Sequence, residues 1–236
     1  MAAMRIYSDW NTRSSDKSEQ IEPYRKYLFI CEGENTEVWY FRQLIEIRKE
    51  LGINPLIDIQ LLERTEEDKT NSNPRKLIEY ANAIIHTPSK FSFDIDRDKI
   101  VLVFDADIYQ EKGELYLRIL NDAKEYILAI SNPCFELFLL LHVKDSYLNH
   151  IKENKIEIER NQKISKSKRF IGNLFFEVTG MNSKKNKLIG HLASDVKIAI
   201  DQETRFINQD ITKGFQELTS TTGLVIQQIM DDDSKE

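Results

Sequence analysis

Carboxylates stand at the ends of two apolar segments. The segment 27–31 (YLFIC) leads directly into Glu32, and the segment 100–104 (IVLVF) leads into Asp105 and Asp107. Short apolar runs that stop at polar residues are typical of buried strands. In an open α/β sheet, ligands bind at the carboxyl ends of the strands, so these acids are placed where a functional site is expected.

The chemistry that such acids favour is the binding of a hard divalent cation. Side chains alternate along a strand, so Asp105 and Asp107 point to the same side if the extended conformation continues. With Glu32 from a neighbouring strand they would supply the oxygen ligands that Mg²⁺ and Mn²⁺ prefer. Neither "EGE" nor "DAD" contains a Lys or Arg, and grouped carboxylates repel one another unless a cation is present.

Other interpretations of these residues stay open. An Asp-x-Asp after a strand also caps helices or fills an Asx turn. Ser131 and Asn132 either cap a helix that begins at Pro133 or belong to the site. His142 is interpreted as a satisfied buried histidine or a cation at a helix end, and Glu34 as a solvated loop charge.

Strands and helices are expected to alternate from residue 26 to 142, which predicts right-handed βαβ crossovers and a mostly parallel sheet flanked by helices. The expected strands are 26–31, 55–63, 99–107 and 126–131, and the expected helices are 36–52, 74–86, 114–125 and 132–142, the last beginning at Pro133.

After residue 145 the composition changes, and polar, Lys-rich segments with helical patterns follow. The last helix is expected over 223–230. The predicted organisation is a flexible arm (1–22), an α/β domain (23–145), a small, mainly helical region (146–230) and an acidic tail (231–236).

Composition favours a folded intracellular protein. The 236 residues carry a net charge of −6 and 41% apolar residues, and the two cysteines, Cys31 and Cys134, lack the spacing of a metal site. No signal peptide or membrane-spanning run is present, so a cytoplasmic protein with no membrane association is expected.

A local basic stretch contrasts with the overall negative charge. Residues 160–187 contain eight Lys and Arg residues and one acid, Glu177. Such a stretch is either a solubilising surface or a phosphate-binding one with salt-sensitive affinity. The candidate nucleic-acid-binding residues are Lys163, Lys166, Lys168, Arg169, Lys184, Lys185 and Lys187.

The segments "CEGENTEVWYF", "VLVFDAD" and "AISNPCFELFLLLH", in this order, resemble the RloB-like family of Toprim-domain proteins from bacterial defence loci. The resemblance covers about residues 26–143, with a weaker likeness in "ELTSTTGLVIQQIM". It implies a Toprim (Rossmann-like) fold with Mg²⁺- or Mn²⁺-dependent phosphodiester chemistry.

The resemblance also implies roles for individual residues. Glu32 matches the Toprim glutamate, a general acid/base or metal ligand, and Asp105 and Asp107 match the metal-binding aspartates. Glu37 and Glu136 are further candidate ligands. The family often has Arg or Lys at position 106, where this chain has alanine. This change removes a positive charge, which would weaken phosphate contact, and keeps the metal ligands.

The function expected from the resemblance is a metal-dependent endonuclease that acts as effector of an anti-phage, abortive-infection system. The implied partners are nucleic acid, with RNA such as tRNA favoured and DNA left open, and an ABC-type ATPase encoded nearby. A homodimer is also left open. The chain itself has neither a G-x-x-x-x-G-K-[ST] nor a G-x-G-x-x-G pattern, so nucleotide hydrolysis would need another chain.

Three other functions compete with this one. A primase would need a zinc module that two isolated cysteines cannot form. A receiver-like phospho-acceptor domain would need a Lys after the last strand, which "YILAISNP" lacks. A non-catalytic nucleic-acid- or partner-binding subunit of an ATPase complex remains the alternative.

Overall fold

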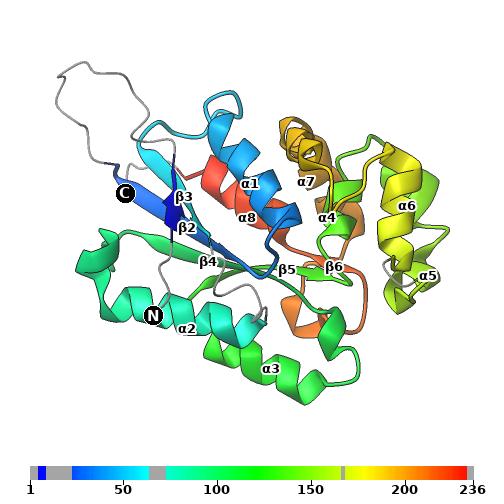
Figure 1. Ribbon diagram of the computed structural model, residues 1–236, viewed down its shortest axis with the longest axis horizontal. Coiled ribbons are helices and arrows are strands. Elements are labelled where there is room, and N and C mark those ends of the chain that lie inside the picture. The colour runs from blue at the N-terminus through cyan, green and yellow to red at the C-terminus, as the bar shows by residue number, and fades with distance from the viewer. Residues whose placement is uncertain (1–4, 9–22, 64–72, 166–167, 233–236) are drawn as a thin grey trace.

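The computed structural model describes residues 5–8, 23–63, 73–165 and 168–232, which form an α/β fold (Figure 1). Their strands make one six-stranded sheet in the order β1-β3-β2-β4-β5-β6. The strands are β1 (Arg5–Tyr7), β2 (Arg25–Cys31), β3 (Ile57–Glu63), β4 (Lys99–Asp105), β5 (Ile127–Asn132) and β6 (Thr219–Ser220).

The four central strands of the sheet are parallel, and the two edge strands are antiparallel to their neighbours. The register pairs Cys31 with Val103 and Asp105 with Ser131, so β2, β4 and β5 end at the same edge. The prediction of a mostly parallel α/β sheet is therefore confirmed.

Helices cover both faces of the sheet (Figure 1). One face carries α1 (Thr36–Glu46), α7 (Val196–Phe206) and α8 (Thr222–Met230), and the opposite face carries α2 (Pro74–His86) and α3 (Gly113–Asp122). Beyond the β5–β6 side lie α4 (Glu136–Leu140), α5 (Lys155–Arg160) and α6 (Phe170–Thr179). Shorter 3-10 helices occur at Pro88–Phe91, Asp107–Tyr109, Lys187–Asp195 and Ile211–Lys213, and a π-helical turn at Tyr147–Ile151.

Burial on both faces explains why the strands are continuously apolar. In β4, Val101 and Val103 pack into the core beneath α1 and α8, whereas Ile100, Leu102 and Phe104 pack against α2 and α3. A parallel sheet covered by helices on both faces buries every strand position, so the strands show no polar alternation.

The local boundaries differ from the sequence predictions at functionally important points. The fourth strand ends at Asp105, because Ala106 turns into the right-handed helical region and Asp107 begins a 3-10 helix. The extended conformation expected through 107 is therefore wrong. The helix expected from Pro133 begins only at Glu136, and the helix expected over 36–52 ends at Glu46, with turns following.

The two ends of the chain also differ from the predicted organisation. Within the predicted arm, Arg5–Tyr7 pairs with β3 as an edge strand, whereas residues 1–4 and 9–22 lie outside the described residues. The predicted region 146–230 is mainly helical and ends in the expected helix, but it also supplies β6, which was not predicted. Thr221 Oγ1 accepts from the Ile130 amide at 3.0 Å, which fastens this last segment to β5.

No helix within the described ranges is long and apolar enough to span a bilayer.

A buried polar group lies between α7, α8 and the sheet. Glu203 is fully buried, and its carboxylate lies against Gly223 in the first turn of α8. Burial raises the pKa of Glu203 to about 7, although the Ser220 hydroxyl and the amides of Gly223 and Leu224 act in the opposite direction. Glu203 is therefore a carboxylate that the folded protein holds close to half-protonated at neutral pH.

The buried Glu203 carboxyl group should lower the free energy of unfolding as pH rises, and Glu203→Gln should remove this loss. Because the folded protein raises this pKa from 4.5 to about 7, it retains a proton that the unfolded chain releases. Stability should therefore fall as pH rises through this range, by about 1.4 kcal/mol for each pKa unit. In urea unfolding, Glu203→Gln should gain stability over wild type at pH 8 and lose that advantage near pH 5. An equal difference at both pH values would contradict this account.

Candidate active site

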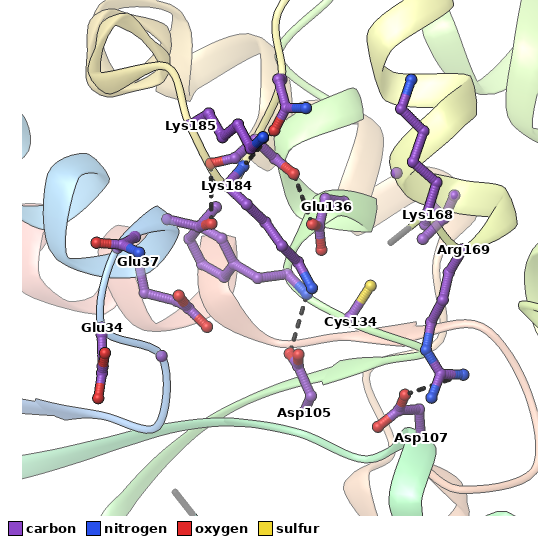
Figure 2. A pocket seen from close by; sticks show the side chains of 18 of the residues that line it. Glu34, Glu37, Asp105, Asp107, Cys134, Glu136, Lys168, Arg169, Lys184 and Lys185 are labelled. Carbon is purple, nitrogen blue, oxygen red and sulfur yellow. Dashed lines mark hydrogen bonds and ion pairs between the residues drawn. The ribbon is translucent and has the colours of Figure 1, made fainter. Parts of the chain in front are cut away.

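A cavity of about 790 Å³ lies at the carboxyl ends of β2, β4 and β5. It is lined by all five predicted acids and five of the seven predicted bases. The acids are Glu32, Glu37, Asp105, Asp107 and Glu136, and the bases are Lys163, Lys168, Arg169, Lys184 and Lys185. In Figure 2, Asp105 and Asp107 lie at the bottom of the view, Glu37 at the left and Glu136 near the centre. Lys184 and Lys185 come from above, and Lys168 and Arg169 from the right.

Glu32 is positioned by the ladder between β2 and β4. Its amide donates to the Val103 carbonyl at 2.8 Å, which extends the parallel pairing one residue past the end of β2. Its carboxylate in turn accepts from the Asp105 amide at 3.2 Å. The two ends of these strands are thus joined through Glu32 itself.

Asp105 is the acid most strongly affected by its surroundings. Its Oδ1 accepts from the Phe135 amide at 2.9 Å, which ties the end of β4 to the turn before α4 (Figure 2). Burial raises the pKa of Asp105 well above its ordinary value, and the negative charges of Glu37, Glu32, Glu136 and Asp107 raise it further. Burial and the four neighbouring acids therefore both disfavour negative charge on this carboxyl group.

Asp107 reaches the same cavity by a different route. The Ala106 amide donates to the Ser131 carbonyl at 2.8 Å, and the chain then turns into the 3-10 helix. Asp107 Oδ2 lies 3.8 Å from Arg169 Nη1. Burial raises the pKa of Asp107, whereas the charges of Arg169 and Lys184 oppose that rise.

Glu37 and Glu136 are both only 7% exposed and come from the first turns of α1 and α4. The Glu37 carboxylate lies so close to Gly33 that a side chain at position 33 would collide with it. Glu136 accepts a 2.7 Å hydrogen bond from the Ser183 hydroxyl, and the Ser183 carbonyl accepts from Thr36 Oγ1 at 3.0 Å.

These Ser183 contacts also place basic groups over the acids. Ser183 is buried, and the next two residues, Lys184 and Lys185, are exposed and line the cavity. The segment that carries the two lysines is therefore fixed to both α1 and α4.

A second basic wall is built by two paired segments, 162–165 and 168–170. The Phe170 amide donates to the Gln162 carbonyl at 3.0 Å, and the Ile164 amide donates to the Lys168 carbonyl at 2.9 Å. This pairing presents Lys163, Lys168 and Arg169 to the cavity. The Lys168 ammonium lies 4.6 Å from the centre of the Phe176 ring.

Some sequence predictions fall outside this arrangement. Lys166 lies outside the described residues, and Lys187 is exposed at the start of a 3-10 helix and does not line the cavity. Glu34, expected to be a solvated loop charge, lines the cavity with its Oε1 buried, and no hydrogen-bond partner for that atom occurs in the described residues.

Asn132 does not cap a helix at Pro133. Asn132 ends β5 and donates from Nδ2 to the Glu217 carbonyl at 2.7 Å, and α4 is preceded by Phe135 without a side-chain cap. His142 is the satisfied buried histidine of the two alternatives. Its ring nitrogens lie 2.9 Å from the Tyr40 hydroxyl and 3.0 Å from the Phe138 carbonyl, and burial lowers its pKa to about 4.

Sequence reasoning missed Cys134 and Ser183 as lining residues. Cys134 stands beside two predicted acids, and its thiol pKa is raised by burial and by the charges of Glu136 and Asp105. Its position within "NPCFE" was a usable signal. Ser183 lies far along the chain from its acid partner, so no local pattern identifies it.

The donor set fits a hard divalent cation in its chemistry. Carboxylate oxygens are the ligands that Mg²⁺ and Mn²⁺ prefer, and the repulsion acting on Asp105 is what a cation would relieve. Among the described residues, however, no three His, Cys, Asp or Glu side chains form a ready-made metal site. The arrangement suits an ion held by one or two carboxylates and completed by water and substrate oxygens.

We expect Asp105→Asn to preserve the fold and to raise its stability when divalent cations are chelated. Asparagine keeps an oxygen for the Phe135 amide but removes the charge that burial and four other acids oppose. The check is thermal unfolding with EDTA at neutral pH. Asp210→Asn is the control, because hydrogen bonds from Thr212 lower the pKa of Asp210 and neutralisation should not stabilise there. A lower melting temperature for Asp105→Asn than for wild type would count against strong repulsion.

Comparisons with known proteins support one assignment. A family described as RloB-like protein matches residues 27–229, which include every acid and basic residue that lines the cavity. No curated protein and no solved structure matches the chain. Because the family match extends over most of its length, this chain is a member of the RloB-like family.

Proposed function

We propose that this RloB-like protein is a Mg²⁺- or Mn²⁺-dependent nuclease of the Toprim kind that hydrolyses phosphodiester bonds. One observation carries the proposal: acids from two strand ends and three helix starts face basic side chains across one cavity. Acids that bind cations and bases that bind phosphates are the two groups that such hydrolysis requires side by side.

The roles follow from the positions of the side chains. Asp105 and Asp107 would hold the cation, with Glu37 and Glu136 as further ligands at the cavity wall. A bound Mg²⁺ or Mn²⁺ would lower the pKa of a bound water and stabilise negative charge on phosphate oxygens. Glu32 would act as ligand or as proton acceptor, since its carboxylate lies at the Asp105 amide.

The basic walls would hold the nucleic-acid strand. Lys184 and Lys185 are fixed to the acid side through Ser183, and Lys168 and Arg169 approach from the opposite side. Lysine and arginine contacts to phosphates give affinity without base recognition, so the walls themselves do not distinguish RNA from DNA. The preference for RNA such as tRNA, the ABC-type ATPase partner and the role in anti-phage defence rest on the family resemblance.

The central test is a cleavage assay on total tRNA and on plasmid DNA. Wild-type protein, alone and with the neighbouring ATPase, should cut one substrate with Mg²⁺ or Mn²⁺ and lose that activity with EDTA. Glu32→Gln and Asp105→Asn should reduce cutting at least about a hundredfold while retaining the fold, because each removes a group at the reacting centre. Cutting by either variant at the wild-type rate would refute the assigned site.

Nucleic-acid binding should depend on Lys184 and not on Lys187. Both are exposed lysines of one segment, but only Lys184 lines the cavity. Lys184→Gln should weaken binding of a labelled oligonucleotide and make its salt dependence shallower by about one charge. Lys187→Gln is the matched control and should bind like wild type in fluorescence anisotropy. Equal losses in both variants would indicate a diffuse positive surface instead of binding in the cavity.

A second candidate is a non-catalytic subunit that binds nucleic acid or the ATPase partner. The observation that favours it is the lack of any ready-made cluster of three metal-ligating side chains among the described residues. Under this alternative, the wild type would not cut nucleic acid. Glu32→Gln and Asp105→Asn would still form the complex with nucleic acid or with the ATPase.

A further inference from the structure

Asp107 is paired with a guanidinium at the cavity, that of Arg169. Arg169 Nη1 lies 3.8 Å from Asp107 Oδ2, and the same nitrogen donates to the Asn161 carbonyl at 3.3 Å. Asn161 is buried in a left-handed conformation, and its own Oδ1 accepts from the Ile171 amide at 3.2 Å. The Asn161 carbonyl, which orients Arg169 towards Asp107, is therefore itself held in position.

The contact between the two charged groups is loose. A separation of 3.8 Å is an ion pair without a close hydrogen bond. The Arg169 side chain is 49% exposed, whereas that of Asp107 is 17% exposed. A guanidinium has five N–H donors in a planar fork, and it binds phosphate in a bidentate manner more strongly than it binds one distant carboxylate oxygen. Arg169 is thus free to exchange Asp107 for a better anion.

Asp107 is also one of the two aspartates to which the proposed function assigns the cation. A divalent cation at Asp107 and the guanidinium at 3.8 Å are like charges that compete for one carboxylate. Binding of the cation would therefore turn Arg169 away from Asp107, and the cavity volume of about 790 Å³ leaves room for that movement.

We propose that Arg169 is the resident counter-ion of Asp107, that a divalent cation displaces it, and that the released guanidinium then binds a phosphate of the nucleic acid. This inference rests on the proposed function, because it takes Asp107 as a metal ligand. Since linkage is reciprocal, a nucleic acid that binds Arg169 also makes the cation bind more tightly, and the two ligands bind cooperatively.

The first test is calorimetric titration with Mn²⁺ alone, which needs no catalysis. Removing the competing cation in Arg169→Gln should tighten Mn²⁺ binding about two- to fivefold, the range that partly exposed ion pairs contribute. Arg169→Lys, which keeps the charge, should stay closer to wild type. Lys168→Gln is the matched control. It removes the positive charge of the neighbouring residue, whose ammonium group lies over the Phe176 ring and not at Asp107.

The second test measures coupling. With a short labelled oligonucleotide present, wild type should bind Mn²⁺ more tightly than without it, and Arg169→Gln should lose most of this gain. Without metal, Asp107→Asn should tighten oligonucleotide binding more than Asp105→Asn does. Both substitutions replace a carboxyl group of the cavity by an amide, but only the first releases Arg169. This comparison stays decisive if Arg169→Gln folds poorly in a thermal unfolding control.

The outcomes separate this inference from the proposed function. If wild type binds Mn²⁺ and Arg169→Gln binds it equally or more weakly, or keeps full coupling, the exchange is refuted and the metal site stands. Equal tightening in Arg169→Gln and Lys168→Gln also refutes it, because general charge then explains the effect. If wild type binds no Mn²⁺ with or without the oligonucleotide, the metal-dependent function and the exchange fail together.

Discussion

Electrostatic repulsion among carboxylates is the constraint around which this end of the molecule is built. Asp105 lies at the floor of the cavity, with Glu32, Glu37, Glu136 and Asp107 all close enough to raise its pKa. A cluster of this kind opposes folding, so the surrounding structure must compensate for it. The compensation comes from amide donors, such as that of Phe135, and from cations at the cavity walls.

The basic walls of the cavity therefore offset the charge of the acids. Arg169 and Lys184 act on Asp107, and Ser183 joins the acid Glu136 to the segment that carries two lysines. Under the proposed exchange, positive groups that neutralise acids in the resting protein would become available to phosphates once a cation takes their place. Such a site would keep its charges balanced both before and after its ligands bind.

The interior beneath the site carries a second polar layer that the proposed chemistry does not use. Tyr40 and His142 form a buried pair, and burial raises the pKa of Tyr40, to which the charge of the fully buried Glu203 adds. Tyr40 lies in α1, Glu203 in α7, and His142 just after α4; of these helices, α1 and α4 also carry acids into the cavity. The core below the site is thus specified by polar contacts as well as by apolar packing.

The sequence by itself determined the alternation of strands and helices, the parallel sheet and the acids Glu32, Asp105 and Asp107, because apolar runs that end in carboxylates are local patterns. Glu37 and Glu136 were identified through the family resemblance. The sequence did not determine where β4 stops, since the turn at Ala106 depends on the Ser131 carbonyl of the neighbouring strand. Only the tertiary structure joined Ser183 to Glu136 and Arg169 to Asp107, because these partners lie 47 and 62 residues apart in the chain and meet only after the sheet has formed. The tertiary structure also decides that Lys184 lines the cavity whereas Lys187 does not.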